Sequence, residues 1–233
     1  MIEFLEDYKK HFDEWYPKEG CGVLGVVKGK LKWFPCENVA EDDSNFTINS
    51  KQFIDIGHKA DIVAVVHNHI SDCAKPSQID IDNCNATNLK YYIFSYPNMD
   101  LEILEPKTIK KTLYGRDYKF GVDDCFEAAR DYYKSIGWNS IPPRAMFEDN
   151  WWKKDLDYFS EEIIKNWQFK KVEGNMEKND FIIFTIHSAV GNHCGVYLGN
   201  DIFYHHAENR LSCRENLYPR WKKYITGVYR YDA

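Results

Sequence analysis

The chain has 233 residues, of which 44% are hydrophobic and 28% charged, so it can form one large globular domain or two small ones. The formal net charge of −6 argues against nucleic acid or an anionic membrane surface as the main partner, and no apolar run of about 18 residues predicts membrane insertion. The cysteine count of seven is odd and the N-terminus lacks an apolar signal segment, so we expect free thiols and synthesis in a reducing cytoplasm.

A change in composition near the middle of the chain predicts two domains. All seven arginines lie at or after Arg116, and residues 104–121 are polar and include a proline and two glycines. We expect one domain over residues 1–108 and another over residues 112–233. The first half alternates strand and helix patterns, which predicts an α/β domain, whereas in the second half a helix precedes most of the strands, which predicts an α+β domain.

The first half contains a predicted hairpin, a buried strand, a helix and two further strands, at residues 21–27 with 31–35, 62–69, 77–90, 91–96 and 101–106. Alternation along the buried strand places His67 and His69 on one face. Asp80, in the following helix, is a candidate third ligand for Zn²⁺, and three protein ligands leave one zinc position open for water. Glu19 is a candidate base for that water.

The motif at Ser77 has a second interpretation. Ser77-x-x-Asp80 is also a capping box, in which the serine begins a helix and the acid lies at its third position. His-x-His is a common sequence, so these residues alone leave zinc binding and ordinary helix capping open. Cys73 and Cys84 lie nearby, but their spacing fits no standard zinc module.

The full spacing of these residues resembles the JAMM (MPN/JAB) metalloprotease family. An upstream Glu19 is followed by His67-x-His69, seven residues, and Ser77-x-x-Asp80. The resemblance implies a cytidine-deaminase-like α/β fold over about residues 1–105, with zinc held by His67, His69 and Asp80. It implies Glu19 as general base and Ser77 as a stabiliser of the oxyanion. Asn68 and Ile70 depart from the usual residues, but neither is a ligand.

The second half begins with a predicted helix at residues 123–137, in which Asp124 is the expected N-cap and Cys125 lies in the first turn. The positive end of the helix dipole favours a thiolate there, while the adjacent carboxylates oppose it. A second helix is predicted at 155–167, and strands at 180–186, 193–200 and 201–206. His193, and either His205 or His206, can therefore meet on neighbouring strands and serve as base and orienting group.

The order of these segments resembles the NlpC/P60 cysteine peptidases. "YKFGVDDCFEAARDYY", "EKNDFIIFTI" and "HCGVYLGNDIFYHHA" follow the family's order of tyrosine, Asp-Cys, buried strand and two histidines. The resemblance implies a papain-like α+β fold, with Cys125 as nucleophile, His193 as base and Tyr118 assisting at the oxyanion. His205 is preferred to His206 because it shares a strand face with Phe203. Asp-Cys-Phe and Asn179-Asp180 depart from the usual Asp-Cys-Ser and Gly-Asp.

A JAMM domain followed by an NlpC/P60 domain resembles the tail assembly proteins of lambda-like phages. That resemblance implies a tail-tip hydrolase made in the host cytoplasm and acting at the host periplasm, whose thiol domain cleaves peptidoglycan stem peptides. It implies other tail-tip proteins as partners and a role for the metallo-domain in tail assembly or processing. Two alternatives remain open: a structural assembly factor with idle sites, and a deubiquitinase-like enzyme, which the second half argues against.

Overall fold

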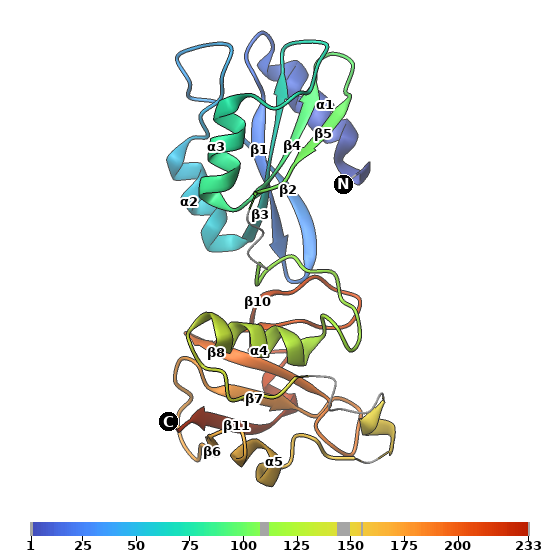
Figure 1. Cartoon of the computed structure of the whole chain (residues 1–233), viewed down its shortest axis with the longest axis vertical. Coiled ribbons are helices and arrows are strands. Elements are labelled where there is room, and N and C mark those ends of the chain that lie inside the picture. Colours follow the sequence, from blue (N-terminus) through green and yellow to red (C-terminus); the bar gives the residue numbers. More distant parts are fainter. Residues whose placement is uncertain (1, 108–111, 144–149, 155, 233) are drawn as a thin grey trace. The chain divides into compact units, whose positions relative to one another are not determined.

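The computed structural model describes residues 2–107, 112–143, 150–154 and 156–232. Two compact units are present, one formed by Met1–Val27 with Leu31–Thr112 and the other by Lys28–Lys30 with Leu113–Ala233. Each unit has its own β-sheet (Figure 1). Of the domain junction expected near residues 106–112, residues 108–111 lie outside the described part of the chain. No helix in the described part of the chain is long and apolar enough to span a bilayer.

The N-terminal unit is a mixed sheet with helices on both faces. Its strand order is β2-β1-β3-β4-β5, in which β3 and β4 are parallel and the pairs β1–β3 and β4–β5 are antiparallel. The elements are α1 (Leu5–Trp15), β1 (Cys21–Val27), β2 (Lys30–Cys36), α2 (Ser50–Lys59), β3 (Asp61–His69), α3 (Gln78–Thr87), β4 (Lys90–Ser95) and β5 (Leu101–Leu104).

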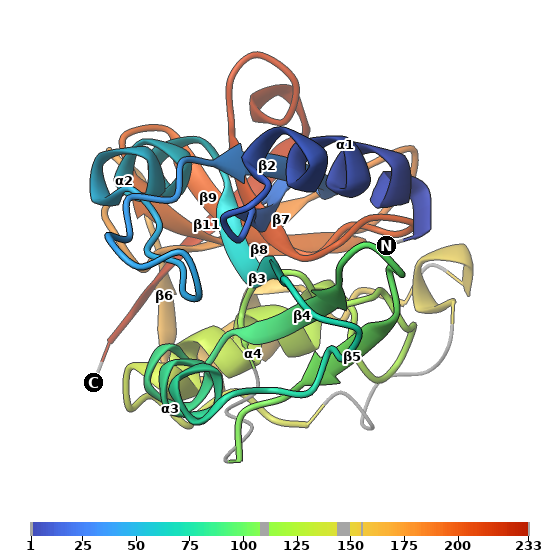
Figure 2. The same ribbon diagram turned by 90° about the horizontal axis from the view of Figure 1, so that it is seen from above.

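The two faces of this sheet bury different hydrophobic clusters. On one face, Leu24 packs with Tyr8 and Phe12 of α1. On the other face, Val65 packs with Cys84 of α3. Successive strand residues point to opposite faces, so strands β1 and β3 contribute side chains to both hydrophobic clusters. Helices α1 and α3 accordingly lie on opposite sides of the sheet, a separation visible in two perpendicular views (Figures 1 and 2).

The C-terminal unit packs one long helix against an antiparallel sheet whose strand order is β10-β9-β8-β7-β11-β6. The face toward α4 buries an aromatic cluster that includes Phe126, Tyr133 and Phe181. The opposite face buries Phe184, Phe203 and other apolar residues. The elements are α4 (Cys125–Ser135), α5 (Glu161–Lys165), β6 (Phe169–Lys171), β7 (Phe181–Phe184), β8 (His193–Gly199), β9 (Ile202–His205), β10 (Cys213–Asn216) and β11 (Ile225–Tyr231).

The α/β and α+β fold classes predicted for the two halves are confirmed, and each strand or helix expected around the two sites is present. The predicted helix over residues 155–167 is shorter, because only Glu161–Lys165 is helical and Ser160 caps it. Helices α1 and α2 and strands β6, β10 and β11 were not predicted. The strands among these are short or mix polar with apolar residues, so pairing with a neighbouring strand, more than local pattern, determines them.

Candidate metal centre and thiol site

Three expected zinc ligands meet at the end of β3. His67 and His69 lie two residues apart on the strand and turn the same way, toward α3. Asp80, in the first turn of α3, points back at them, and its Oδ1 and Oδ2 lie 3.2 Å from Nε2 of His67 and Nε2 of His69, respectively. The two Nε2 atoms are themselves 3.2 Å apart.

This donor triangle fits a zinc ion. Zinc–ligand bonds of about 2.0–2.1 Å in a tetrahedron require ligand atoms roughly 3.3 Å apart, close to the 3.2 Å separations found here. Two imidazole nitrogens and one carboxylate oxygen are ligands that zinc prefers. Burial lowers the pKa of His67, whose side chain is fully buried, which keeps its ring neutral as a metal ligand requires.

Ser77 and Asp80 also form the capping box that the sequence offered as the alternative interpretation. The Ser77 hydroxyl accepts from the Asp80 backbone N–H at 3.2 Å, and Oδ2 of Asp80 accepts from the Ser77 N–H at 2.8 Å and from its hydroxyl at 2.7 Å. The two interpretations are therefore compatible, because the cap orients the carboxylate toward the histidines. Although burial opposes it, hydrogen bonds from His67, His69 and Ser77 hold the pKa of Asp80 well below its usual range.

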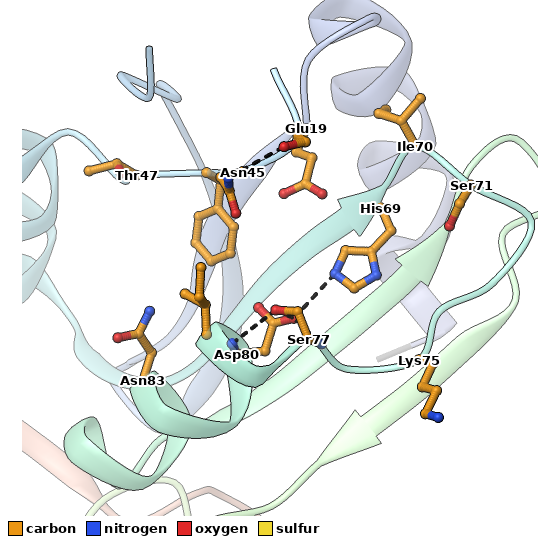
Figure 3. Close-up of a pocket in the computed structure, with 13 residues that line it drawn as sticks. Glu19, Asn45, Thr47, His69, Ile70, Ser71, Lys75, Ser77, Asp80 and Asn83 are labelled. Carbon is orange, nitrogen blue, oxygen red and sulfur yellow. Dashed lines mark hydrogen bonds and ion pairs between the residues drawn. The ribbon is translucent and has the colours of Figure 1, made fainter. Parts of the chain in front are cut away.

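Glu19 and His69 line the same cavity. Glu19 precedes β1, and its side chain points into this cavity of about 510 Å³, which Ser77 and Asp80 also line (Figure 3). Burial raises the pKa of Glu19 to about 8, with the charge of His69 acting in the opposite direction. A carboxyl group with such a pKa exchanges a proton near neutral pH, as a general acid–base group must.

Asn68 has a structural role at this site. Its Oδ1 accepts a hydrogen bond from the Gly20 N–H at 2.8 Å, and its own backbone N–H donates to the Gly20 carbonyl at 3.2 Å. Both bonds fix the residue that follows Glu19 against β3. The departure from the usual residue at position 68 therefore leaves the Glu19 backbone anchored to the strand that carries the two histidines.

Cys125 is the first residue of α4, and the residue is 5% exposed. The helix begins there because the Asp124 carboxylate accepts from the N–H groups of Phe126 and Glu127 at 3.0 and 3.1 Å. The Asp124 side chain also accepts from the Gly121 N–H at 3.0 Å, which ties the preceding loop to the cap. The cap therefore fixes the position of the thiol at the first turn.

A hydrogen bond with Cys194 and another with His193 lower the pKa of Cys125 to about 6, although burial acts in the opposite direction. The contribution of Cys194 was not expected from the sequence. Cys194 can reach Cys125 because strand alternation places it on the face of β8 that packs against α4. A thiol with a pKa near 6 is mostly thiolate at neutral pH, which is the reactive form.

His193 and His205 meet on neighbouring strands β8 and β9. Nε2 of His193 lies 3.0 Å from Nδ1 of His205. Gly195 is paired directly with His205, and a Cβ on Gly195 would lie 2.9 Å from the Phe203 ring and 3.3 Å from Cβ of His205. The glycine therefore leaves room for the diagonal contact between the two imidazoles.

His205 and His206 face different neighbours. The ring of His205 stacks on Phe203 with centroids 4.3 Å apart, on the face that carries His193. The ring of His206 instead lies edge-on to Tyr118, at 5.2 Å between centroids. Of the two candidates, His205 is the one in contact with His193.

Tyr118, Cys125 and His193 line one cavity of about 310 Å³. Its wall includes Phe120 and Trp221, and its polar lining is completed by side chains such as Asp124, Asn192 and Glu208. The residues expected for thiol chemistry are thus brought together, with His205 one hydrogen bond behind His193. Elsewhere in this unit, Asp180 of the Asn-Asp pair bonds Nε and Nη2 of Arg230 at 2.8 and 2.9 Å, a structural contact.

Glu215 on β10 is a further residue of this site that was not predicted from the sequence. Its Oε2 lies 3.2 Å from Nε2 of His205 and 2.9 Å from Nη2 of Arg210. Alternation between Cys213 and Glu215 could have placed both on one face of a strand, but nothing in the sequence indicated that this strand pairs with β9.

Two family models match the chain, one in each unit. Residues 4–104 match the model of prokaryotic homologs of the JAB domain, and residues 115–230 match that of the NlpC/P60 family. The chain therefore consists of a JAB-type domain followed by an NlpC/P60 domain.

The chain is also similar over most of its length to one kind of phage protein. The chain is 26% identical over 218 residues to the tail tip assembly protein K of Escherichia phage N15, covering 93% of this chain and 89% of that protein. It is 24% identical over 175 residues to the tail tip assembly protein K of Escherichia phage lambda, covering 75% and 84%.

Solved structures of both kinds of domain were also matched. A JAB1/MPN domain protein from Archaeoglobus fulgidus is 17% identical with a TM-score of 0.30, covering 44% of this chain and 83% of that one. An NLP/P60 family protein from Staphylococcus aureus is 19% identical with a TM-score of 0.34, covering 52% and 38%.

Proposed function

We propose that this chain is a phage tail-tip protein whose C-terminal domain is a thiol endopeptidase that cleaves peptide stems of peptidoglycan. The observation that carries the proposal is the buried Cys125 thiol at the start of α4, with its pKa lowered to about 6 beside His193 in a cavity. The NlpC/P60 match over residues 115–230 supports it. The similarity to two tail tip assembly proteins supports the tail-tip role and other tail proteins as partners.

The residues of the thiol site have distinct tasks in this mechanism. The Cys125 thiolate attacks the carbonyl carbon of a γ-D-glutamyl–diamino acid amide, and a C–S bond forms. Protonated His193 gives its proton to the leaving amine as the C–N bond breaks. Water, deprotonated by the same histidine, then cleaves the thioester and regenerates the thiol. His205 orients His193, and Tyr118, on the cavity wall, contributes at the oxyanion.

For the N-terminal domain we propose a zinc-dependent peptidase-like activity in tail assembly or processing, with His67, His69 and Asp80 as ligands. Zinc bound by these three residues would supply Lewis acidity. Glu19 holds and releases a proton in the cavity that the ligands line, and its raised pKa near 8 supports that role. Ser77 orients Asp80 through the hydrogen bond that its hydroxyl donates to Oδ2. To stabilise an oxyanion, the same hydroxyl proton has to turn away from Asp80.

Digestion of purified bacterial peptidoglycan tests the thiol activity. We expect wild-type protein to release stem-peptide fragments, detected by mass spectrometry, and Cys125→Ala to release none. Cys73→Ala is the matched control, because Cys73 is an exposed cysteine in the other domain. Glu19→Ala should leave these fragments unchanged, because the two sites act on separate substrates.

The opposite result would favour a different function. If folded wild-type protein with metal present releases no fragments, the chain is better described as a structural assembly factor that retains hydrolase folds. The similarity to tail tip assembly proteins over 93% of the chain is the observation that favours this second candidate. We further propose synthesis in the host cytoplasm, a place in the tail tip, action at the host periplasm, and domain limits at residues 1–108 and 112–233.

A further inference from the structure

Behind the thiol site, a chain of polar contacts continues past the two histidines to a carboxylate. Nε2 of His193 lies 3.0 Å from Nδ1 of His205, and Nε2 of His205 lies 3.2 Å from Oε2 of Glu215. Strands β8, β9 and β10 supply one member each. The His205 side chain is 1% exposed and that of Glu215 is 7% exposed, so bulk water does not compete for these contacts.

We propose that Glu215 is a positioning residue that determines which ring nitrogens of His205 and His193 carry protons, so that a bare Nδ1 of His193 faces the Cys125 thiol. This inference rests on the proposed thiol endopeptidase function. It adds Glu215 to the residues of the thiol site and assigns the direction of the hydrogen bonds from His193 to His205 and from His205 to Glu215.

The directions of these hydrogen bonds follow from the charge of Glu215. Although burial acts in the opposite direction, the hydrogen bond with His205 and the charge of Arg210 lower the pKa of Glu215 to about 2, so it is a carboxylate that only accepts. Nε2 of His205 must then carry the proton. Burial lowers the pKa of His205, so the ring is neutral and its Nδ1 is bare.

The protonated nitrogen of His193 is determined in the same way. Because Nδ1 of His205 is an acceptor, Nε2 of His193 donates to it. While Cys125 still carries its proton, His193 is neutral as well, because burial lowers its pKa, and its Nδ1 is then the bare nitrogen. Nε2 is already engaged, which leaves Nδ1 for the contact with Cys125. The thiol proton moves to this atom, forming a thiolate and an imidazolium whose Nε2–H remains bonded to His205.

A metal site is the competing explanation for the same side chains. The ligand atoms of His205, Cys213 and Glu215 all lie within 4.8 Å of one another. However, Arg210 places a guanidinium nitrogen 2.9 Å from Oε2 of Glu215. A cation there would face that permanent positive charge, whereas a carboxylate that accepts from both Arg210 and His205 is electrostatically satisfied.

The test compares Glu215→Leu, which removes the acceptor, with Glu215→Gln, which keeps an acceptor oxygen without the charge. Ring ¹⁵N spectra of the full chain report the protonated nitrogen of each histidine. We expect Nε2–H on both His193 and His205 in wild type and in Glu215→Gln. In Glu215→Leu the buried Nε2–H of His205 keeps only the sulfur of Cys213, 4.0 Å away, which is a weak acceptor. The proton of His205 therefore moves to Nδ1, and Nε2 of His193 loses its acceptor and its proton.

The rate of Cys125 alkylation by iodoacetamide at pH 7 is the second readout. We expect Glu215→Leu to lower it at least about tenfold and Glu215→Gln by less, because a wrong tautomer removes the base while leaving the thiol in place. Glu173→Leu, at an exposed position in the same unit, is the matched control and should change neither readout. Circular dichroism checks that each variant is folded.

Two results would overturn the role of Glu215. One is a wild-type spectrum with the proton on Nδ1 of His205, which decides the question even if Glu215→Leu does not fold. The other is a folded Glu215→Leu protein with wild-type tautomers and alkylation rate. An inert Cys125 in wild type, with Cys73 reacting normally, would instead refute the proposed thiol function, so the two failures are distinguishable.

Discussion

The acidity of the Cys125 thiol is directly testable by replacing its neighbours. Its pKa is lowered from 9.0 to about 6 by hydrogen bonds with Cys194 and His193, against the effect of burial. The difference between these two pKa values corresponds to about a thousandfold in acidity, or about 4 kcal/mol. At pH 7 such a thiol is roughly nine-tenths thiolate, whereas a thiol with a pKa of 9 is about one-hundredth thiolate.

We therefore expect His193→Ala to lower the alkylation rate of Cys125 at pH 7 by about 10- to 100-fold, because burial remains while the base is lost. Cys194→Ala should lower this rate less, although the hydrogen bond with Cys194 contributes most to the lowered pKa. The reason is that a thiol is a weak donor, whereas the thiolate–imidazolium pair is charge-assisted.

Rates measured with iodoacetamide between pH 5 and 9, with mass mapping of the labelled cysteine, give the midpoint directly. Wild type should reach half of its maximal rate near pH 6, and His193→Ala at a clearly higher pH. A midpoint that stays near pH 6 in folded His193→Ala protein would refute the assignment of His193 as the partner of Cys125.

Three further predictions concern the ligands, the second histidine and the helix cap. Elemental analysis of protein prepared without chelator should find zinc equimolar with the chain, and the zinc should be lost in His67→Ala and Asp80→Ala. Asn83→Ala should keep it, because this variant alters the cavity wall and no ligand. Wild-type protein without metal would contradict the proposed zinc site. His205→Ala should slow Cys125 alkylation more than His206→Ala, because only His205 contacts His193, and equal losses would exclude the orienting role. Asp124→Ala should lower the free energy of unfolding by about 1–2 kcal/mol in urea titrations, because two N–H groups of α4 lose their acceptor, and an unchanged midpoint would show that the cap contributes little.

The candidate metal centre was largely predictable because its parts are local in sequence. His67 and His69 are related by strand alternation, and Ser77 and Asp80 by the geometry of one helical turn. What joins these pairs is a crossover between parallel strands, which places the start of α3 at the end of β3. The prediction of Glu19 depended on the family spacing as well, because Glu19 is distant in sequence from the histidines. The neighbouring Gly20 is anchored to Asn68, 48 positions further along the chain.

The thiol site depended more on tertiary structure. Strand alternation favoured His205 over His206, and the geometry agrees with that preference. Cys194 was not recognised, because its effect on Cys125 depends on how α4 packs on β8. Glu215 was not recognised either, because strand β10 has a polar sequence and pairing with β9 is what aligns it with the histidines.

The sequence by itself determined the residue types, their order and the local elements that carry them, because helix caps and strand alternation act over two to four residues. Only the tertiary structure decided which side chains touch across strands: the 3.2 Å donor triangle of the candidate metal centre, and the contacts that run from Cys125 through His193 and His205 to Glu215. The physical reason is that sheet register and helix packing are set by the burial of whole faces, which no short motif encodes.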